Sequence, residues 1–252
     1  MINVLMRGCN GRMGQMITSV VKERENMNIV AGVDLFDGIQ NDYPVYKNIK
    51  DVKEAFDVVI DFTKADDELD QMVEFCVENS KPVVLCTTGL SEKQLLNVME
   101  ASKKVAVLRS ANMSLGINIL LKFLKESTGI LAENGFDIEI VEKHHNQKLD
   151  APSGTALALG DACNEALSNE YEYVFDRSQR RMKRPKKEIG YAAVRGGSIV
   201  GEHDVIFAGQ DEVITVSHSA FSRAVFAKGA VSAAAFLFDK GPGLYDMSDV
   251  IG

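Results

Sequence analysis

The sequence lacks paired cysteines and long hydrophobic runs. Its four cysteines show no Cys-x-x-Cys spacing, so we expect reduced thiols. No apolar stretch reaches the ~18 residues that a membrane-spanning helix needs, and internal repeats and low-complexity linkers are absent. The first four residues lead directly into a strand-like run, with no basic leader. Together these absences predict a cytoplasmic protein that does not enter membranes.

Positive charge is scarcer than negative charge. The chain carries 28 Lys and Arg against 36 Asp and Glu, a formal net charge of −8. This balance disfavours a general nucleic-acid or anionic-membrane binder, although it leaves room for a local basic site that takes an acidic small molecule. The hydrophobic content of 46% and charged content of 25% are ordinary for a globular protein. The length of 252 residues predicts two domains or one large α/β unit.

The N-terminal stretch follows the order strand, glycine turn, helix, strand. We predict strands over 2–6 and 29–33 and a helix over 15–24. The turn holds Gly8, Gly11 and Gly14, and Asp34 comes twenty residues later. At that spacing an acidic side chain can reach the ribose hydroxyls of a dinucleotide whose pyrophosphate lies at the helix N-terminus. The pattern G-x-x-G-x-x-G departs from G-x-G-x-x-G, and an ordinary tight turn is the alternative. The flanking elements and Asp34 favour nucleotide binding.

Strands and helices continue to alternate up to residue 113. The expected strands are 56–62, 82–86 and 105–108, and the expected helices are 67–79 and 91–101. Repeated βα units of this length predict a Rossmann-type, doubly wound parallel sheet with right-handed crossovers. Ligands of such sheets lie over the carboxyl ends of the strands. The segments expected at those ends are 8–14, 34, 61–63, 86–89 and 110–113.

The pattern changes after a long helix over 114–131. Strands are predicted over 137–144, 189–195, 201–208 and 212–219, with a hairpin turn at 209–212. They are no longer each separated by a helix, which indicates a second, α+β domain with a mixed, largely antiparallel sheet. An alanine-rich helix over 223–240 is expected to return to the nucleotide domain. The segment 177–187 holds seven basic residues, and we interpret it as a solvated loop rather than a nucleic-acid patch.

The stretch from 141 to 155 concentrates polar chemistry at a strand-to-helix connection. Glu142 and His144 share one face of the preceding strand, while Pro152 and Ser153 are expected at the start of the following helix, with proline in the first turn and serine as the cap. The free N–H groups around 153–155 then form an anion cradle, just downstream of His145 and of a lysine. A loop that only caps a helix is the alternative.

The chemistry of this stretch favours hydride transfer to an acidic, electrophilic substrate. Lys148 suits a carboxylate or a carbanionic centre because a positioned cation stabilises developing negative charge. His144 suits proton exchange near neutrality. Zinc is a poor alternative, because His144 and His145 are adjacent and neither a His-x-x-x-His pair nor a cysteine pair lies nearby. We therefore expect no metal.

Residues 142–156, Glu-Lys-His-His-Asn-Gln-Lys-Leu-Asp-Ala-Pro-Ser-Gly-Thr-Ala, resemble the signature of the bacterial dihydrodipicolinate reductase family. The similarity extends over essentially the whole chain, through segments 8–14, 61–63, 87–89, 110–113, 194–203 and 243–247. It implies reduction of a cyclic diacid by NADH or NADPH in lysine and diaminopimelate biosynthesis, and a homotetramer assembled through the sheet of the second domain. It also implies a dinucleotide-binding domain of residues 1–113 and 223–252 and a substrate-binding and oligomerisation domain of residues 114–222.

The resemblance also assigns roles to single residues. His144 and Lys148 become the proton-transfer residues, and how they divide that role stays open. Substrate carboxylate binding falls to His145, Ser153, Gly154 and Thr155. Nucleotide contacts fall on Gly8, Cys9, Asn10, Gly11, Arg12, Met13, Asp34, Cys86, Thr87, Thr88, Ser110, Ala111, Asn112 and Met113.

Two positions depart from the family pattern near the expected nicotinamide. Cys86 stands where many relatives have glycine, and Met113 where many have phenylalanine, which implies a different packing of the nicotinamide. Two other functions compete with the reductase: a dehydrogenase of another amino acid or semialdehyde, and a nucleotide-sensing protein without turnover. The discriminating property is consumption of reduced nicotinamide with the cyclic substrate.

We predict a preference for NADH over NADPH. Asp34 is followed by Leu35, Phe36 and Asp37, without the arginine that often follows the acidic residue in relatives and can receive a 2′-phosphate. An acidic residue without that cation repels the extra phosphate, although Arg12 is an alternative cation. The measurement is kcat/KM for each cofactor, and a strong preference for NADPH would refute the prediction.

Overall fold

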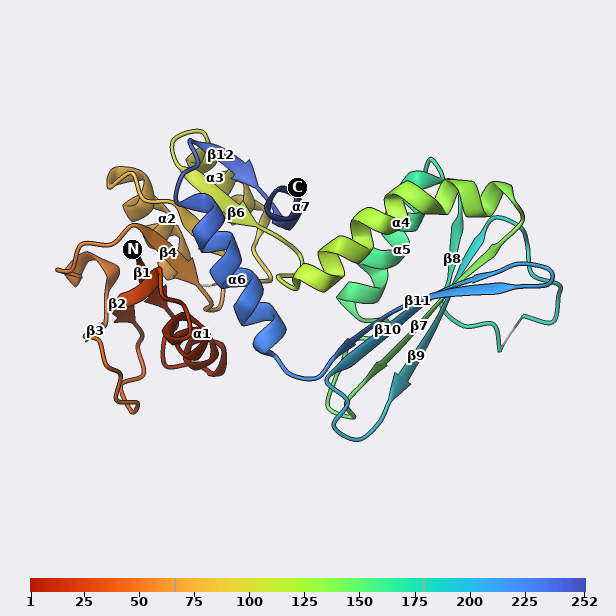
Figure 1. Cartoon of the computed structure of the whole chain (residues 1–252), viewed down its shortest axis with the longest axis horizontal. Coiled ribbons are helices and arrows are strands. Elements are labelled where there is room, and N and C mark those ends of the chain that lie inside the picture. The colour runs from red at the N-terminus through yellow and green to blue at the C-terminus, as the bar shows by residue number, and fades with distance from the viewer. Residues whose placement is uncertain (66, 179) are drawn as a thin grey trace. The chain divides into compact units, whose positions relative to one another are not determined.

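The chain forms two compact units in the computed structural model, which describes residues 1–65, 67–178 and 180–252 (Figure 1). Unit 1 comprises Met1–Leu115 and Arg223–Gly252, and unit 2 comprises Gly116–Ser222. Within the described residues, no helix is both long and apolar enough to cross a bilayer.

Unit 1 is built on a parallel sheet with the strand order β12-β6-β5-β4-β1-β2-β3. The strands are β1 (Ile2–Arg7), β2 (Met27–Val33), β3 (Val45–Tyr46), β4 (Val58–Asp61), β5 (Val83–Leu85), β6 (Ala106–Arg109) and β12 (Gly243–Tyr245). The helical segments are α1 (Arg12–Lys22), η1 (Ile49–Asp51), α2 (Asp67–Glu78), α3 (Glu92–Ser102), α6 (Ala224–Leu237) and α7 (Met247–Ile251). The predicted doubly wound parallel sheet is confirmed.

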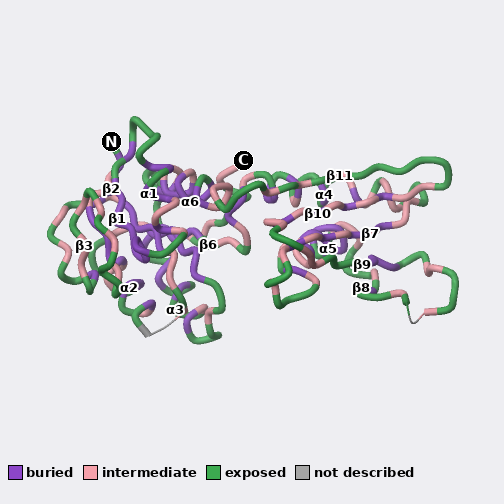
Figure 2. The backbone as a smooth tube through the Cα atoms, turned by 90° about the horizontal axis from the view of Figure 1, so that it is seen from below, coloured by how far each residue is buried: buried purple, intermediate pink, exposed green. Residues whose placement is uncertain are grey.

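The two faces of this sheet bury separate apolar clusters. Side chains of α1 and α6 pack on one face, where Ile17 and Val231 are fully buried. Side chains of α2 and α3 pack on the other, around Leu69 and Val98. The buried segments, purple in Figure 2, run through the strands and through α6. Because both faces are covered, the strands read as continuous hydrophobic runs, and this made them recognisable in the sequence.

Helix α1 begins earlier than the sequence pattern predicted. Gly11 has an extended backbone (φ −73°, ψ 165°) and caps a helix that starts at Arg12, whereas the apolar periodicity suggested a start at Gln15. The first turn, residues 12–15, has Met13 as its single apolar side chain. One residue shows no periodicity, so the pattern placed the start of the helix too late. Arg12 and Met13 therefore belong to the helix N-terminus itself.

Unit 2 packs two helices on one face of a mixed sheet with the order β11-β10-β7-β9-β8. Its elements are α4 (Leu115–Glu133), β7 (Asp137–His144), α5 (Gly154–Ala166), β8 (Glu172–Val174), β9 (Glu188–Arg195), β10 (Gly201–Ala208) and β11 (Val213–Ala220). The central strand β7 runs antiparallel to β10 and parallel to β9. The sheet is mixed as predicted, and among the described residues its parallel pairs equal its antiparallel pairs in number.

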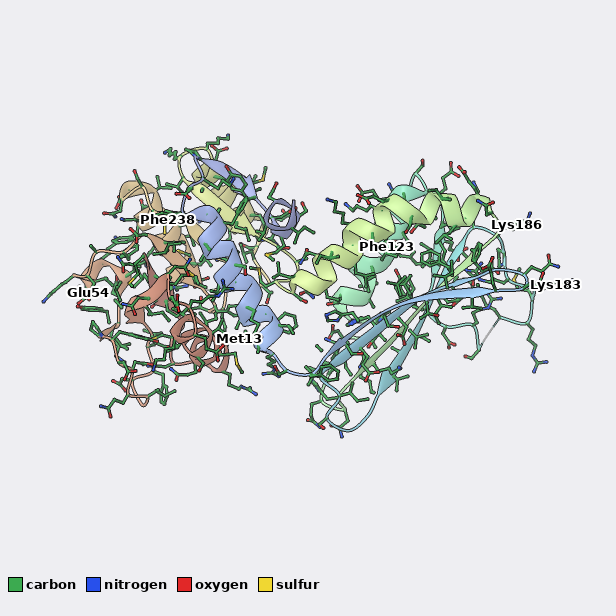
Figure 3. The ribbon with its side chains drawn as sticks, in the orientation of Figure 1. Met13, Glu54, Phe123, Lys183, Lys186 and Phe238 are labelled. Atoms are coloured by element: carbon green, nitrogen blue, oxygen red, sulfur yellow. The ribbon has the colours of Figure 1, made fainter. Side chains whose placement is uncertain are left out.

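The basic segment 177–187 is less solvated than predicted. Arg184 donates to Glu139 Oε1 (2.9 Å) and Asp137 Oδ1 (2.8 Å) of β7. Arg177 pairs with the buried Glu188 of β9. Sequence proximity could not reveal these partners, because they lie on strands that meet the loop only in the folded unit. Lys183 and Lys186 do extend into solvent (Figure 3), and Gln179 lies outside the described residues.

Gly229→Ala should destabilise unit 1. An added Cβ would lie 1.6 Å from the carbonyl oxygen of Met113, so α6 would have to move off the backbone it packs on, at a cost of about 1–3 kcal/mol. Gly129→Ala in α4 is the matched control, because its nearest neighbour would lie at 3.6 Å and alanine favours a helix by ~1 kcal/mol. Urea unfolding should move the two midpoints in opposite directions. Equal midpoints would contradict this account.

Candidate active site

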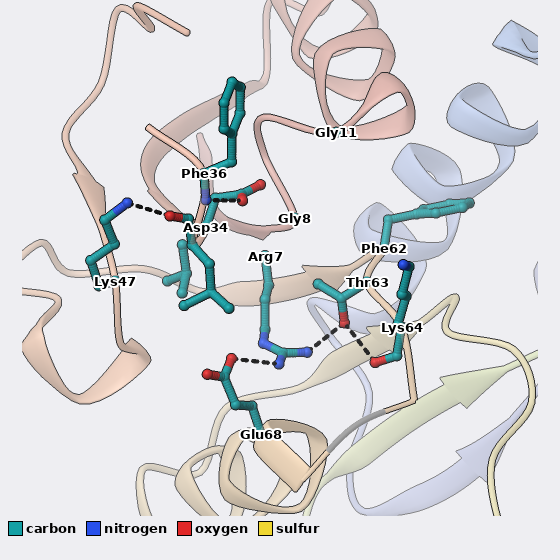
Figure 4. A pocket seen from close by; sticks show the side chains of 12 residues that line it. Arg7, Gly8, Gly11, Asp34, Phe36, Lys47, Phe62, Thr63, Lys64 and Glu68 are labelled. Carbon is teal, nitrogen blue, oxygen red and sulfur yellow. Dashed lines mark hydrogen bonds and ion pairs between the residues drawn. The ribbon is translucent and has the colours of Figure 1, made fainter. Parts of the chain in front are cut away.

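The strand order of unit 1 reverses at β1, where open α/β sheets hold their ligands. The chain continues from β1 to β2 on one side and returns to β4 on the other. A cavity of about 460 Å³ lies at the carboxyl ends of these strands (Figure 4). It is lined by Arg7, Gly8, Gly11, Val33, Asp34, Leu35, Phe36, Lys47, Phe62, Thr63, Lys64 and Glu68.

The glycine turn brings the backbone close together at one wall of this cavity. Gly8 has φ +80°, and a Cβ there would lie 2.7 Å from the carbonyl oxygen of Phe62, so the position excludes side chains. A Cβ on Gly14 would lie 2.1 Å from the Gly8 oxygen. Gly11 offers no side-chain cap to α1, which leaves the helix N-terminus suited to an anion.

Asp34 stands at the end of β2 with its carboxylate held by backbone groups. Oδ2 accepts from the N–H of Asn10 and Oδ1 from the N–H of Phe36, both at 2.9 Å. Lys47, which the sequence pattern did not single out, lines the same cavity and pairs with Asp37 at 3.1 Å. Its place after a two-residue strand gave no periodic signal.

A buried ion pair supports the floor of the crevice. Arg7 at the end of β1 donates to Asp61 Oδ1 at the end of β4 (2.8 Å), and these residues are 4% and 0% exposed. Thr63 also accepts from Arg7, at 2.6 Å, and Thr87 donates to Asp61. The hydroxyl of Thr87, just after β5, therefore links the ends of β5 and β4.

The residues predicted to contact the cofactor differ in solvent exposure. The side chains of Cys9, Asn10, Cys86, Thr87 and Met113 are buried. Burial raises the pKa of the Cys9 thiol to about 12 and that of Cys86 well above its ordinary value, so both thiols stay protonated near neutral pH. Arg12, Thr88 and Ala111 are exposed, and Met13, Ser110 and Asn112 are half-buried. A helix N-terminus, a glycine cradle and a carboxylate in one crevice fit the pyrophosphate and ribose of a dinucleotide.

Strand β7 delivers the histidine predicted to transfer protons. Buried and half-buried residues alternate along β7, and Ile138, Ile140, Glu142 and His144 share the buried face, as predicted. His144 Nδ1 lies 2.5 Å from Glu142 Oε2. Burial lowers the pKa of His144; Glu142 opposes this shift, and the charges of Lys148 and Arg195 add to it.

Glu142 is a buried anion held by an arginine that sequence analysis did not assign. Arg195 at the end of β9 donates to both carboxylate oxygens, at 2.7 Å and 2.6 Å. Burial alone would raise the pKa of Glu142, but the hydrogen bonds from Arg195 and His144 outweigh it and lower the pKa. Arg195 lies within segment 194–203, one of the segments that resemble the family. This resemblance was the only indication in the sequence that Arg195 could belong to the site.

Ser153 caps α5 from a buried position. Its Oγ accepts from the N–H of Ala156 (3.1 Å) and lies 3.0 Å from His203 Nε2. Its own N–H donates to Glu142 Oε1 at 3.1 Å. Pro152 precedes the cap, so its predicted place in the first turn is wrong: the helix begins at Gly154. The Ser153 hydroxyl is thus already used in hydrogen bonds within the protein.

The N-terminus of α5 already attracts a carboxylate of the chain. Lys148 pairs with Asp150 at 2.8 Å. The hydrogen bond from Lys148 lowers the pKa of Asp150, and the backbone N–H of Gly154 acts in the same direction. Gly154 is exposed and Thr155 half-buried, which is where a carboxylate can approach the helix end. Nδ1 of His145 is buried and has no hydrogen-bonding partner among the described residues.

No group of three or more His, Cys, Asp or Glu side chains in the described part of the chain is arranged to hold a metal ion. The polar groups of unit 2 instead combine an imidazole, an ammonium and a helix N-terminus. Such a set can bind a carboxylate and exchange a proton.

Comparison with known proteins relates both units to one family. A model described as "Dihydrodipicolinate reductase, N-terminus" matches residues 2–113, and one described as "Dihydrodipicolinate reductase, C-terminus" matches residues 116–251. The chain is 53% identical over 251 residues to a protein of Caldanaerobacter subterraneus subsp. tengcongensis named 4-hydroxy-tetrahydrodipicolinate reductase, covering 100% of this chain and 98% of that protein. A Clostridium novyi protein of the same name is 49% identical, with coverage of 100% and 98%.

Solved structures agree with this relationship. The dipicolinate-bound dihydrodipicolinate reductase of Paenisporosarcina sp. TG-14 is similar with a TM-score of 0.79 and 25% identity, covering 98% of this chain and 97% of that one. A diaminopimelate dehydrogenase of C. glutamicum is similar with a TM-score of 0.56, covering 98% and 93%. At 14% identity it shares the fold alone.

The buried His203 should make the protein sensitive to acid. Burial lowers its pKa from 6.5 to about 4, so the unfolded chain binds a proton below pH 6.5 that the folded chain takes up only near pH 4. Stability should therefore fall as the pH falls through this window, by about 3 kcal/mol. Unfolding in urea at pH 7 and 4.5 should show a smaller loss for His203→Gln than for the wild type. An equal loss would contradict the assignment, since His144 and His218 titrate in both proteins.

Proposed function

Because the chain belongs to the dihydrodipicolinate reductase family, we propose that it catalyses the NAD(P)H-dependent reduction of 4-hydroxy-tetrahydrodipicolinate to tetrahydrodipicolinate in lysine and diaminopimelate biosynthesis. The observation that carries the proposal is the set of His144, Lys148 and the α5 N-terminus on a chain that also has a dinucleotide crevice. Substrate and product differ by the 4-hydroxyl group. A hydride and a proton therefore enter while water leaves.

The nucleotide is assigned to residues 1–113 and 223–252. The α1 N-terminus would take the pyrophosphate and Asp34 the ribose hydroxyls, and bound NAD(P)H supplies the hydride. We favour NADH because the 2′-phosphate would meet the carboxylates of Asp34 and Asp37, and Lys47 is already paired with Asp37. The remaining contacts would come from the carboxyl ends of β5 and β6.

The diacid substrate is assigned to residues 114–222. One carboxylate would bind the N–H groups at Gly154 and Thr155 and the side chain of His145, and Lys148 would exchange its bond to Asp150 for one to the substrate. His144 would donate the proton through Nε2, because Nδ1 is held by Glu142. The Paenisporosarcina relative is described as dipicolinate-bound, and dipicolinate is a ring diacid, which supports a diacid as the substrate of this chain.

We assign oligomerisation to the face of the unit 2 sheet that α4 and α5 leave uncovered. This face carries both charged and apolar side chains: Lys143 lies beside Glu202 at 3.0 Å, and Ile206 is half-buried. A homotetramer built through this face, working in the cytoplasm, fits the family. Sedimentation at several concentrations measures the stoichiometry.

A coupled assay tests the function. The condensation product of aspartate semialdehyde and pyruvate is generated in place, and consumption of reduced nicotinamide is expected only when this chain is present. Cofactor binding without oxidation would indicate a nucleotide sensor. Oxidation with an open-chain semialdehyde alone would indicate another dehydrogenase.

Lys148→Ala and Asp34→Ala should separate the two proposed sites. Loss of the ammonium should lower kcat about 10²-fold or more with little effect on NADH affinity. Loss of the carboxylate should weaken NADH binding about tenfold, as expected for one charge-assisted hydrogen bond, and shift the cofactor preference. Lys183→Ala on the exposed loop is the control. Equal effects of both variants on NADH binding would undermine the assignment.

A further inference from the structure

Arg195 reaches two parts of the proposed substrate site at once. Its guanidinium grips the Glu142 carboxylate with two bonds of 2.7 Å and 2.6 Å. The same Nη2 donates to the carbonyl oxygen of Asp150 at 2.6 Å, and the carboxylate of Asp150 holds Lys148. One rigid, planar fork therefore ties β9 to β7 and to the loop before α5.

Glu142, which Arg195 holds, in turn hydrogen-bonds His144 and the start of helix α5. Its Oε2 holds Nδ1 of His144, and its Oε1 accepts the N–H of Ser153, the cap of α5. The residue is 1% exposed, so water does not compete for these bonds. A single carboxylate thus connects the imidazole to the helix end that would bind the substrate carboxylate.

We infer that Arg195 and Glu142 are positioning residues of the reduction, which hold His144, the α5 N-terminus and the Lys148 loop in one geometry. This inference rests on the proposed function. Neither residue needs to touch the substrate, because each acts through a group that does.

The pair also determines which nitrogen of His144 exchanges protons. An anion on Nδ1 keeps a proton there and leaves Nε2 for the substrate. Gly201 on the neighbouring strand leaves room beside the ring, since a Cβ there would make a tight contact of 3.1 Å with Nε2. Lys148, Arg195 and His203 also face this imidazole, and Glu142 is the anion among the groups that shift its titration.

A purely structural ion pair predicts a different outcome from a positioning pair. Breaking a buried pair destabilises a protein wherever it lies, and such a loss lowers activity without changing its pH dependence. Loss of the Glu142 charge should instead disfavour the imidazolium of His144. As a proton donor, His144 is active only when protonated, so the pH at which kcat falls should move downward.

The test compares Glu142→Gln with wild type and with Glu165→Gln. Glu165 pairs with Lys125 at 2.7 Å on the surface of the same unit and is the matched control. For Glu142→Gln we expect kcat to fall about 10²- to 10³-fold, NADH affinity to be unchanged, and the descending limb of the pH profile to shift to lower pH. Proton NMR titration of the His144 ring should show the same shift without turnover.

Arg195→Lys keeps the charge but loses the fork and serves as the second variant. We expect a kcat at least tenfold below wild type, with unfolding in urea and NADH binding close to wild type. Wild-type kcat in Arg195→Lys would overturn the inference, as would a Glu142→Gln enzyme whose pH profile and His144 titration match those of Glu165→Gln. An inactive wild-type chain would instead refute the proposed function.

Discussion

A charge that folding removes from water has to be paired, and both units meet this requirement at the ends of neighbouring parallel strands. In unit 1, Arg7 on β1 pairs with Asp61 on β4. In unit 2, Arg195 on β9 pairs with Glu142 on β7. Each pair fixes the loops that leave its strands. The crevice of unit 1 lies at the loops after β1 and β4, while His144 ends β7 and Lys148 lies on the loop that follows. Both proposed sites therefore depend on a buried ion pair.

Each proposed site contains the N-terminus of a helix, and the two helix ends are capped differently. Helix α1 presents an uncapped glycine end, which suits the close approach of a pyrophosphate. Helix α5 is capped by Ser153, whose bonds to Glu142 and His203 bring the helix end and the imidazole of His144 into one network. The cap and the proposed carboxylate cradle are thus parts of a single structure. A capped helix end is more rigid, and this favours a substrate that has to be oriented as well as bound.

Much of the fold could be predicted because its signals are local. Alternation of polar and apolar residues located β7, and apolar runs located the longer strands of unit 1. The bounds of β7 and β10 are those predicted. The short strands β3, β8 and β12 escaped prediction, since two or three residues contain no period. Partners of the basic segment escaped it as well: Arg184 lies 45 residues from Glu139 in the chain, and only strand pairing brings them together.

The sequence by itself determined the order of the elements and the stretch of residues 142–156 that carries His144 and Lys148, because strand alternation, helix caps and motif spacing are properties of neighbouring residues. Tertiary structure alone decided which residues join the hydrogen-bond network of Glu142 and Ser153. Arg195 binds Glu142 from 53 residues away in the chain, and His203 contacts Ser153 from 50 residues away. Their positions follow from the register of β9 and β10 against β7. Register is set by packing across the whole sheet, and alternation along one strand does not specify which strand will lie beside it.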